Sequence, residues 1–139
     1  MKGINFGRVI LGGLLAGVVN NLFGYIGHDV ILKEADQAMM KALGKTMPEG
    51  GSTMVVWILM GFVFGIAAVW LYAAIRPRYG AGVGTAVRAG LAVWFFSCVY
   101  TTIVMTNLGI AAFNATAFVL DLVASVLATV AGAWLYKEA

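Results

Sequence analysis

Long apolar stretches separated by short polar segments are the main pattern in this chain. One stretch runs from Val9 to Gly27, a second from Gly50 to Ile75, and a third from Ala89 to Leu120, with more apolar sequence after Asp121. A membrane-spanning helix needs ~20 mostly apolar residues. The pattern therefore predicts four spans, at about 9–27, 53–75, 87–106 and 113–136.

The division of the third stretch decides where a charged residue lies. The uncharged run up to Leu120 is too long for one ordinary span, and the stretch after Asp121 is too short for another. Asn107 and Gly109 favour a turn, so we divide the run there. This division places Asp121 inside the membrane, and a three-span arrangement is the alternative.

The segment between the first two spans has a different pattern. Between Asp29 and Gly44, apolar residues recur every three or four positions, and charged or amide side chains fill the other face. This spacing predicts an amphipathic helix over about 29–44 that lies on the outer membrane surface or caps the bundle. Asp29 suits a helix start, and Gly44 followed by Pro48 suits its end.

Composition supports a membrane protein and argues against several other classes. Hydrophobic residues make up 62% of the chain and charged residues 11%, against about 45–50% and 25% in soluble domains. The net charge of +3 comes from basic residues spread along the chain, which is not a nucleic-acid-binding pattern. The single cysteine, Cys98, excludes an internal disulfide. We expect one all-α domain over residues 1–139, with the lipid bilayer as its first partner and no cofactor.

Basic residues predict how the chain is oriented. With four spans, both termini share a side with the loop at 76–88, and that side carries Lys2, Arg8, Arg76, Arg78, Arg88 and Lys137. The opposite side carries only Lys33, Lys41 and Lys45. The positive-inside rule then places both termini in the cytoplasm. Around the glycine-rich loop, we expect Arg76, Arg78 and Arg88 to contact anionic lipid headgroups.

Small residues at helical spacing predict close helix packing. In the first span Gly13 and Gly17 are followed by Gly24, and in the second Gly61 precedes Gly65. The fourth span continues the pattern with Ser125, Thr129 and Gly132. Such faces let helix backbones approach closely in lipid. They indicate either packing within one chain or an interface between subunits.

The main candidate for a functional residue is Asp121. A charged side chain in the hydrocarbon costs ~2.5–3.5 kcal/mol on insertion scales, so it is retained with a partner or in contact with water. Asn114 and Ser125 share its helical face, and Asn20 or Asn21 of the first span lies at a similar depth. We interpret these residues as a polar clasp between helices, or as an ion, proton or substrate site, or as a subunit contact.

Other reactive residues give weaker signals. His28 follows the first span and is a weak candidate for a metal or pigment ligand, but no Cys, Glu or second His stands at ligand spacing. A solvated histidine at the membrane interface is the simpler interpretation. The sequence also has no paired carboxylates and no Ser/His/Asp set at useful positions, so we do not expect an enzyme.

A short repeat links the second and fourth spans. Trp70-Leu71-Tyr72 ends the second predicted span, and Trp134-Leu135-Tyr136 ends the fourth. Two helical hairpins in the same orientation would explain the repeat. Interfacial aromatic residues are common in membrane helices, and this is the plainer explanation.

Several runs resemble those of a known group of proteins. They are Val-Trp-Leu-Tyr at 69–72, Arg-Pro-Arg-Tyr-Gly at 76–80, Gly-Leu-Ala-Val-Trp at 90–94, and the opening Phe6–Val18. They resemble a group of small, uncharacterised bacterial four-helix integral membrane proteins of about this length. The resemblance covers most of the chain and implies a bacterial cytoplasmic (inner) membrane. It implies no activity.

These observations lead to two functional expectations. The first is a non-enzymatic helical subunit, or an accessory or scaffold protein, within a membrane assembly that is a homo-oligomer or a larger complex. The alternative is a small oligomeric channel or transporter with its polar site around Asp121. Whether Asp121 faces a wet cavity or a dry helix contact distinguishes the two.

Overall fold

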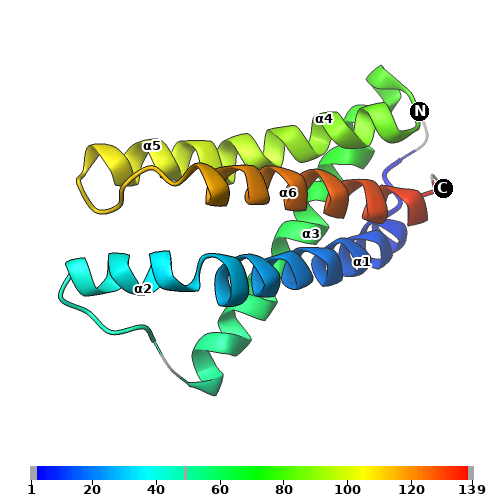
Figure 1. The fold of residues 1–139 in the computed structure, drawn as a ribbon. Coiled ribbons are helices and arrows are strands. Elements are labelled where there is room, and N and C mark those ends of the chain that lie inside the picture. The colour runs from blue at the N-terminus through cyan, green and yellow to red at the C-terminus, as the bar shows by residue number, and fades with distance from the viewer. Residues whose placement is uncertain (1–2, 49, 138–139) are drawn as a thin grey trace.

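The computed structural model describes residues 3–48 and 50–137, and within them every regular element is a helix. In chain order the elements are α1 (Phe6–Gly24), η1 (Tyr25–Ile31), α2 (Lys33–Ala42), α3 (Gly51–Tyr79), α4 (Val83–Trp94), η2 (Phe95–Val99), α5 (Tyr100–Asn107) and α6 (Ala115–Leu135). The segments η1 and η2 are π-helical. Each widens the backbone without breaking the helix, so α1 continues into η1, and α4 continues through η2 into α5 (Figure 1).

Four helices in the described part of the chain are long and apolar enough to cross a membrane. They are Phe6–Ile31, Gly51–Tyr79, Val83–Asn107 and Ala115–Leu135. An all-α fold with four candidate spans, as the sequence predicts, is therefore confirmed. The longest, α3, has 29 residues and so extends about 43 Å. Because this exceeds a hydrocarbon core of ~30 Å, α3 must tilt or protrude, and it crosses behind α1 and α6 (Figure 1).

Both ends of the chain lie at the same end of the bundle as the connection between α3 and α4 (Figure 1). At the opposite end are α2 and the turn between α5 and α6. The helix α2 contacts mainly η1 and runs on roughly in line with α1, instead of folding across the ends of the other helices (Figure 1). Its regular part is ten residues long, which is shorter than the helix expected at about 29–44.

Burial divides the bundle into two halves. In α1 the buried residues end at Gly17 and in α4 at Gly90, whereas in α3 they begin at Gly65 and in α6 at Ala128. These buried residues all lie at the end of the bundle where α1 begins and α6 ends, which we call the packed half. Its core consists mainly of alanine, with Val9, Val69, Tyr72 and Tyr136 as the larger members. The remainder is the open half, where only Gly27 and Leu32 are buried among the described residues.

Glycines bring the helices of the packed half into backbone contact. A Cβ added at Gly65 of α3 would lie 2.5 Å from both the carbonyl oxygen of Gly13 and the amide nitrogen of Gly17 in α1. A Cβ at Gly13 would meet Ile66 at 2.5 Å, and one at Gly17 would overlap Phe62. The crossing of α1 and α3 is therefore possible only with glycine at these positions.

Some other glycines lie where α6 crosses α1 and α4, and one lies at no helix crossing. A Cβ at Gly132 of α6 would lie 2.6 Å from the carbonyl oxygen of Gly12 in α1, and one at Gly90 of α4 would lie 2.9 Å from a backbone carbon of α6. A Cβ at Gly61 would overlap the side chain of Asn21. Around Gly24, a Cβ would meet nothing within 4 Å. Although Gly24 continues the predicted glycine stripe, it therefore packs against no other part of the described chain.

The repeated Trp-Leu-Tyr triplets meet in the packed half, although one lies inside α3 and the other ends α6, with Tyr136 directly after that helix. The rings of Tyr72 and Tyr136 are both buried and meet edge to face, with centroids 5.9 Å apart. The tryptophans of the two triplets, Trp70 and Trp134, are exposed. Each triplet thus places its tyrosine between the helices and its tryptophan on the outside of the bundle.

Candidate functional site

Asp121 lies on α6 in the open half, where it is half-buried and faces η2. The Cys98 thiol of η2 lies close to its carboxyl group. Helical side chains lean toward the N-terminus of their own helix. Because α6 begins at the α5–α6 turn, the Asp121 carboxyl leans toward that turn, while Cys98 on the antiparallel helix leans the opposite way. The two groups therefore meet between the helices.

Two more residues complete this contact between α6 and the neighbouring helix. The indole N–H of Trp94 donates to the carbonyl oxygen of Phe118 at 3.3 Å, and the two rings stack edge to face with centroids 4.8 Å apart. Thr102 lies one turn beyond Cys98, with its hydroxyl 3.9 Å from the thiol sulfur. Trp94, Cys98 and Thr102 thus form one polar stripe at four-residue spacing, in which Trp94 precedes the π-helical turn η2, Cys98 lies within it and Thr102 follows it.

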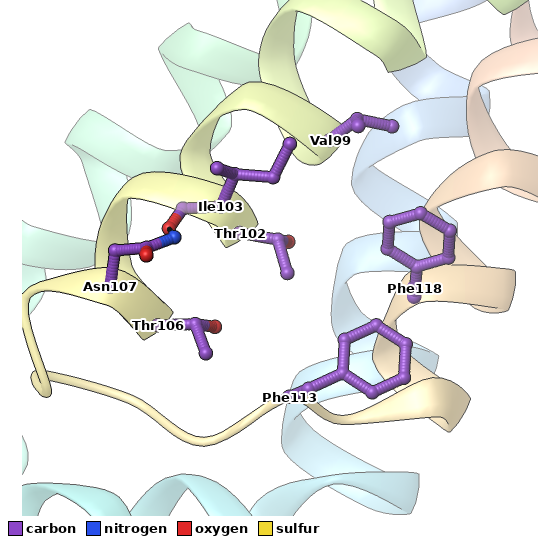
Figure 2. A pocket seen from close by; sticks show the side chains of 7 residues that line it. All are labelled: Val99, Thr102, Ile103, Thr106, Asn107, Phe113 and Phe118. Atoms are coloured by element: carbon purple, nitrogen blue, oxygen red, sulfur yellow. Dashed lines mark hydrogen bonds between the residues drawn. The ribbon is translucent and has the colours of Figure 1, made fainter.

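A pocket of about 290 Å³ lies next to this stripe, toward the α5–α6 turn. It is open to the surface and is lined by Val99, Thr102, Ile103, Thr106, Asn107, Phe113 and Phe118. Figure 2 shows the threonine side chains on one wall and the two phenylalanine rings on the other. The rings lie edge to face, with centroids 5.5 Å apart. Two lining residues, Thr102 and Phe118, connect the pocket to the contact around Asp121.

Three of the residues that the sequence groups with Asp121 form hydrogen bonds to other groups. The side-chain amide of Asn21 donates to the carbonyl oxygen of Ile58 in α3 at 3.2 Å, so it bonds to α3 and not to Asp121. Asn114 caps the start of α6 by accepting a hydrogen bond from an amide of the first turn at 3.1 Å. Ser125 donates to the carbonyl oxygen of Gly90 in α4 at 2.8 Å. Asn20 is half-buried on α1.

His28 is paired at the end of η1. Its Nδ1 lies 2.9 Å from a carboxylate oxygen of Asp36 in α2, and the His28 side chain is 53% exposed. This contact bridges the bend at Leu32 and ties α2 to η1. Both members of the pair are close enough to Asp121 to interact with it electrostatically. Within residues 3–48 and 50–137, no group of three His, Cys, Asp or Glu residues could hold a metal ion.

The arginines at the packed end lie over aromatic rings. The guanidinium of Arg76 is 5.5 Å from the ring centroid of Tyr136, and that of Arg88 is 5.1 Å from the centroid of Tyr79. Arg78 is exposed at the end of α3. The Thr85 hydroxyl donates to the carbonyl oxygen of Gly80 at 2.8 Å, which holds the loop between the helices. This end presents a basic surface on an ordered loop.

Sequence pattern alone points to Asp121 but not to the residues that surround it. In the sequence Cys98 is a lone thiol, and no pattern used above marks Trp94, Thr102 or Phe118. The four-residue spacing of Trp94, Cys98, Thr102 and Thr106 is the signal that could have found this stripe.

Comparison with known proteins assigns no family to this chain, since no protein-family model, curated protein or solved structure matches it.

Proposed function

We propose that this protein is a non-enzymatic helical subunit or accessory protein that packs against other helices in a membrane assembly. One observation carries the proposal. Every residue of α3 from Met54 to Met60 is exposed, and Trp57 is 71% exposed. Over these two turns, a hydrogen bond from the Asn21 side chain to the carbonyl oxygen of Ile58 connects α3 to α1. This part of α3 offers a helix surface that a neighbouring helix could cover.

The use of glycine supports the same role. In lipid, helices associate through close packing of small residues. The glycines of the packed half already form the crossings within this chain. A partner would therefore meet the open half, where α2 contacts mainly η1 and α3 is exposed from Met54 to Met60.

The proposed location is a bacterial cytoplasmic membrane with both termini in the cytoplasm. The predicted four-span orientation assigns six basic residues to the side of the termini and three to the other side. Both chain ends and the α3–α4 connection lie at one end of the bundle (Figure 1). The positive-inside rule then favours the cytoplasm for that end, with its arginines near anionic headgroups.

Cysteine cross-linking in native membranes tests the packing role. In a Cys98→Ser background, Trp57→Cys places a thiol on the exposed part of α3. Trp134→Cys is the matched control, because Trp134 is 80% exposed but lies in the packed half. We expect Trp57→Cys to form cross-linked species, with this chain or another, several-fold faster than Trp134→Cys. Equal rates at the two positions would contradict the proposal.

Transport is the second candidate, and the surroundings of Asp121 favour it. The carboxyl group lies in the open half next to a pocket that reaches the surface, while the packed half is closed by its core. Passage across the membrane would require the glycine crossings of the packed half to separate. Flux of protons or monovalent cations into liposomes tests this role. A flux that Asp121→Asn abolishes would support it, and an absence of flux in the native protein would rule it out.

A further inference from the structure

We propose that the pocket beside the α5–α6 turn binds a small hydrophobic ammonium ion, with the carboxylate of Asp121 as its counter-charge. This binding site goes beyond the packing role proposed above and does not depend on it. It joins two features of the open half: an aromatic pocket, and a carboxyl group one helical turn along α6 from Phe118, which lines that pocket.

The walls of the pocket suit an organic cation. Phe113 and Phe118 form one wall, and the Trp94 ring contacts Phe118 from the deeper side. The faces of aromatic rings attract cations, and ammonium groups are commonly bound by several rings together. The opposite wall carries Thr102 and Thr106, whose hydroxyl oxygens can accept N–H hydrogen bonds (Figure 2).

Asp121 lies one helical turn below the pocket. Phe118, which lines the pocket, precedes it by three residues on α6. On the opposite helix, Thr102 lines the pocket and contacts Cys98, and Cys98 contacts Asp121. Since side chains on α6 lean toward the α5–α6 turn, we expect the carboxyl group to point along the helix toward the pocket.

Asp121 has no counter-charge at ion-pair distance within the described chain. None of the described lysines or arginines forms an ion pair with it. His28 interacts with it electrostatically, while the Nδ1 of its imidazole lies 2.9 Å from Asp36. An ionised carboxylate in a membrane is costly without a counter-charge. A bound cation would supply the counter-charge.

The size and chemistry of the pocket narrow the ligand class. A volume of about 290 Å³ is at the lower limit of ~300–1,000 Å³ for small-molecule sites, so it suits one ammonium group with a short apolar substituent. A bare metal ion fits poorly, since no group of three metal-ligating side chains lies in the described part of the chain. Together these properties favour a hydrophobic amine or quaternary ammonium ion.

The experiment compares a cation with its neutral isostere. The purified full chain is placed in nanodiscs of zwitterionic phosphatidylcholine, so that anionic lipid does not collect the cation. Binding of benzyltrimethylammonium and of neopentylbenzene, which replaces the ammonium nitrogen by carbon, is then measured by titration. We expect saturable binding of the cation, at least about tenfold tighter than the neutral isostere. Equal affinities, or no saturable binding of the cation, would overturn the proposal.

Three variants locate the site. Asp121→Asn keeps the shape of the side chain and removes its charge, and we expect it to bind the cation at least about tenfold more weakly. Asp29→Asn is the matched control, because Asp29 is exposed on η1, and it should bind as the native protein does. Phe118→Leu should weaken binding about two- to fivefold through the lost ring. Unchanged binding in Asp121→Asn, or an equal loss in Asp29→Asn, would overturn the proposal.

Discussion

Replacing Gly65 by alanine should destabilise the crossing of α1 and α3. The new Cβ would lie 2.5 Å from the carbonyl oxygen of Gly13, 2.5 Å from the amide nitrogen of Gly17 and 2.9 Å from the Gly17 Cα. All three are backbone atoms, so no side chain can rotate away. The two helices would have to separate by roughly 1 Å to restore ordinary contact, and a gap of that size forfeits up to about half of the dispersion energy of each contact.

Two opposing effects set the magnitude. Overpacking a well-packed site costs about 1–3 kcal/mol, while alanine is favoured over glycine within a helix by about 1 kcal/mol. Gly24→Ala gains the same helix preference, but its Cβ meets nothing within 4 Å. We therefore expect the free energy of unfolding to be about 1–3 kcal/mol lower for Gly65→Ala than for Gly24→Ala. The difference in free energy of unfolding between the two variants measures the cost of adding a Cβ at the α1–α3 crossing.

Reversible unfolding in mixed detergent micelles, followed by tryptophan fluorescence, measures this difference. The native protein, Gly65→Ala and Gly24→Ala are titrated with dodecyl sulfate under identical conditions. Gly24→Ala should match the native protein or exceed its stability slightly. If Gly65→Ala proves as stable as Gly24→Ala, the backbone contact between α1 and α3 is not what holds the packed half together.

Three further predictions concern the polar contacts and the orientation. Asn21→Ala should lower the free energy of unfolding by ~0.6–1.7 kcal/mol through the lost interhelical hydrogen bond, and more than the neighbouring Asn20→Ala does; equal effects would mean that the bond to α3 contributes nothing. Tyr72→Phe removes the hydroxyl that accepts a hydrogen bond from an α3–α4 loop amide at 3.2 Å, so that amide should exchange with deuterium several-fold faster by mass spectrometry. Thiols introduced by Arg78→Cys and Lys41→Cys, in a background without the native cysteine, should react with a membrane-impermeant maleimide from opposite sides of the membrane. Labelling of both from one side would refute the predicted orientation.

The surroundings of Asp121 show where inference from the sequence alone reaches its limit. Asn20 or Asn21 is suggested as its partner because each lies at a similar distance from the end of its span. That distance can be counted from residue numbers, at 1.5 Å per helical residue. The direction in which a side chain points also depends on how each helix is rotated about its axis. That rotation brings Asn21 against α3 and leaves Asp121 facing Cys98.

The glycines show the same limit. Their spacing predicts close packing, and a Cβ added at Gly13, Gly17, Gly65 or Gly132 would meet backbone or side-chain atoms of another helix. The same spacing includes Gly24, which has open space around it. Because the helices cross at an angle and diverge in the open half, a stripe that is continuous in sequence is not covered along its whole length: a Cβ at Gly61 would still meet the Asn21 side chain, whereas one at Gly24 would meet nothing.

The helical class, the four candidate spans and the division near the α5–α6 turn can be predicted from the sequence. They depend on local hydropathy and on turn residues such as Gly109, which has a positive φ of 68° and can adopt it because it lacks a side chain. Which helices touch, that the core occupies one half of the bundle, and that an aromatic pocket lies one helical turn from Asp121 are known only from the fold. These features depend on how helices distant in sequence cross, and local periodicity does not specify which helices meet.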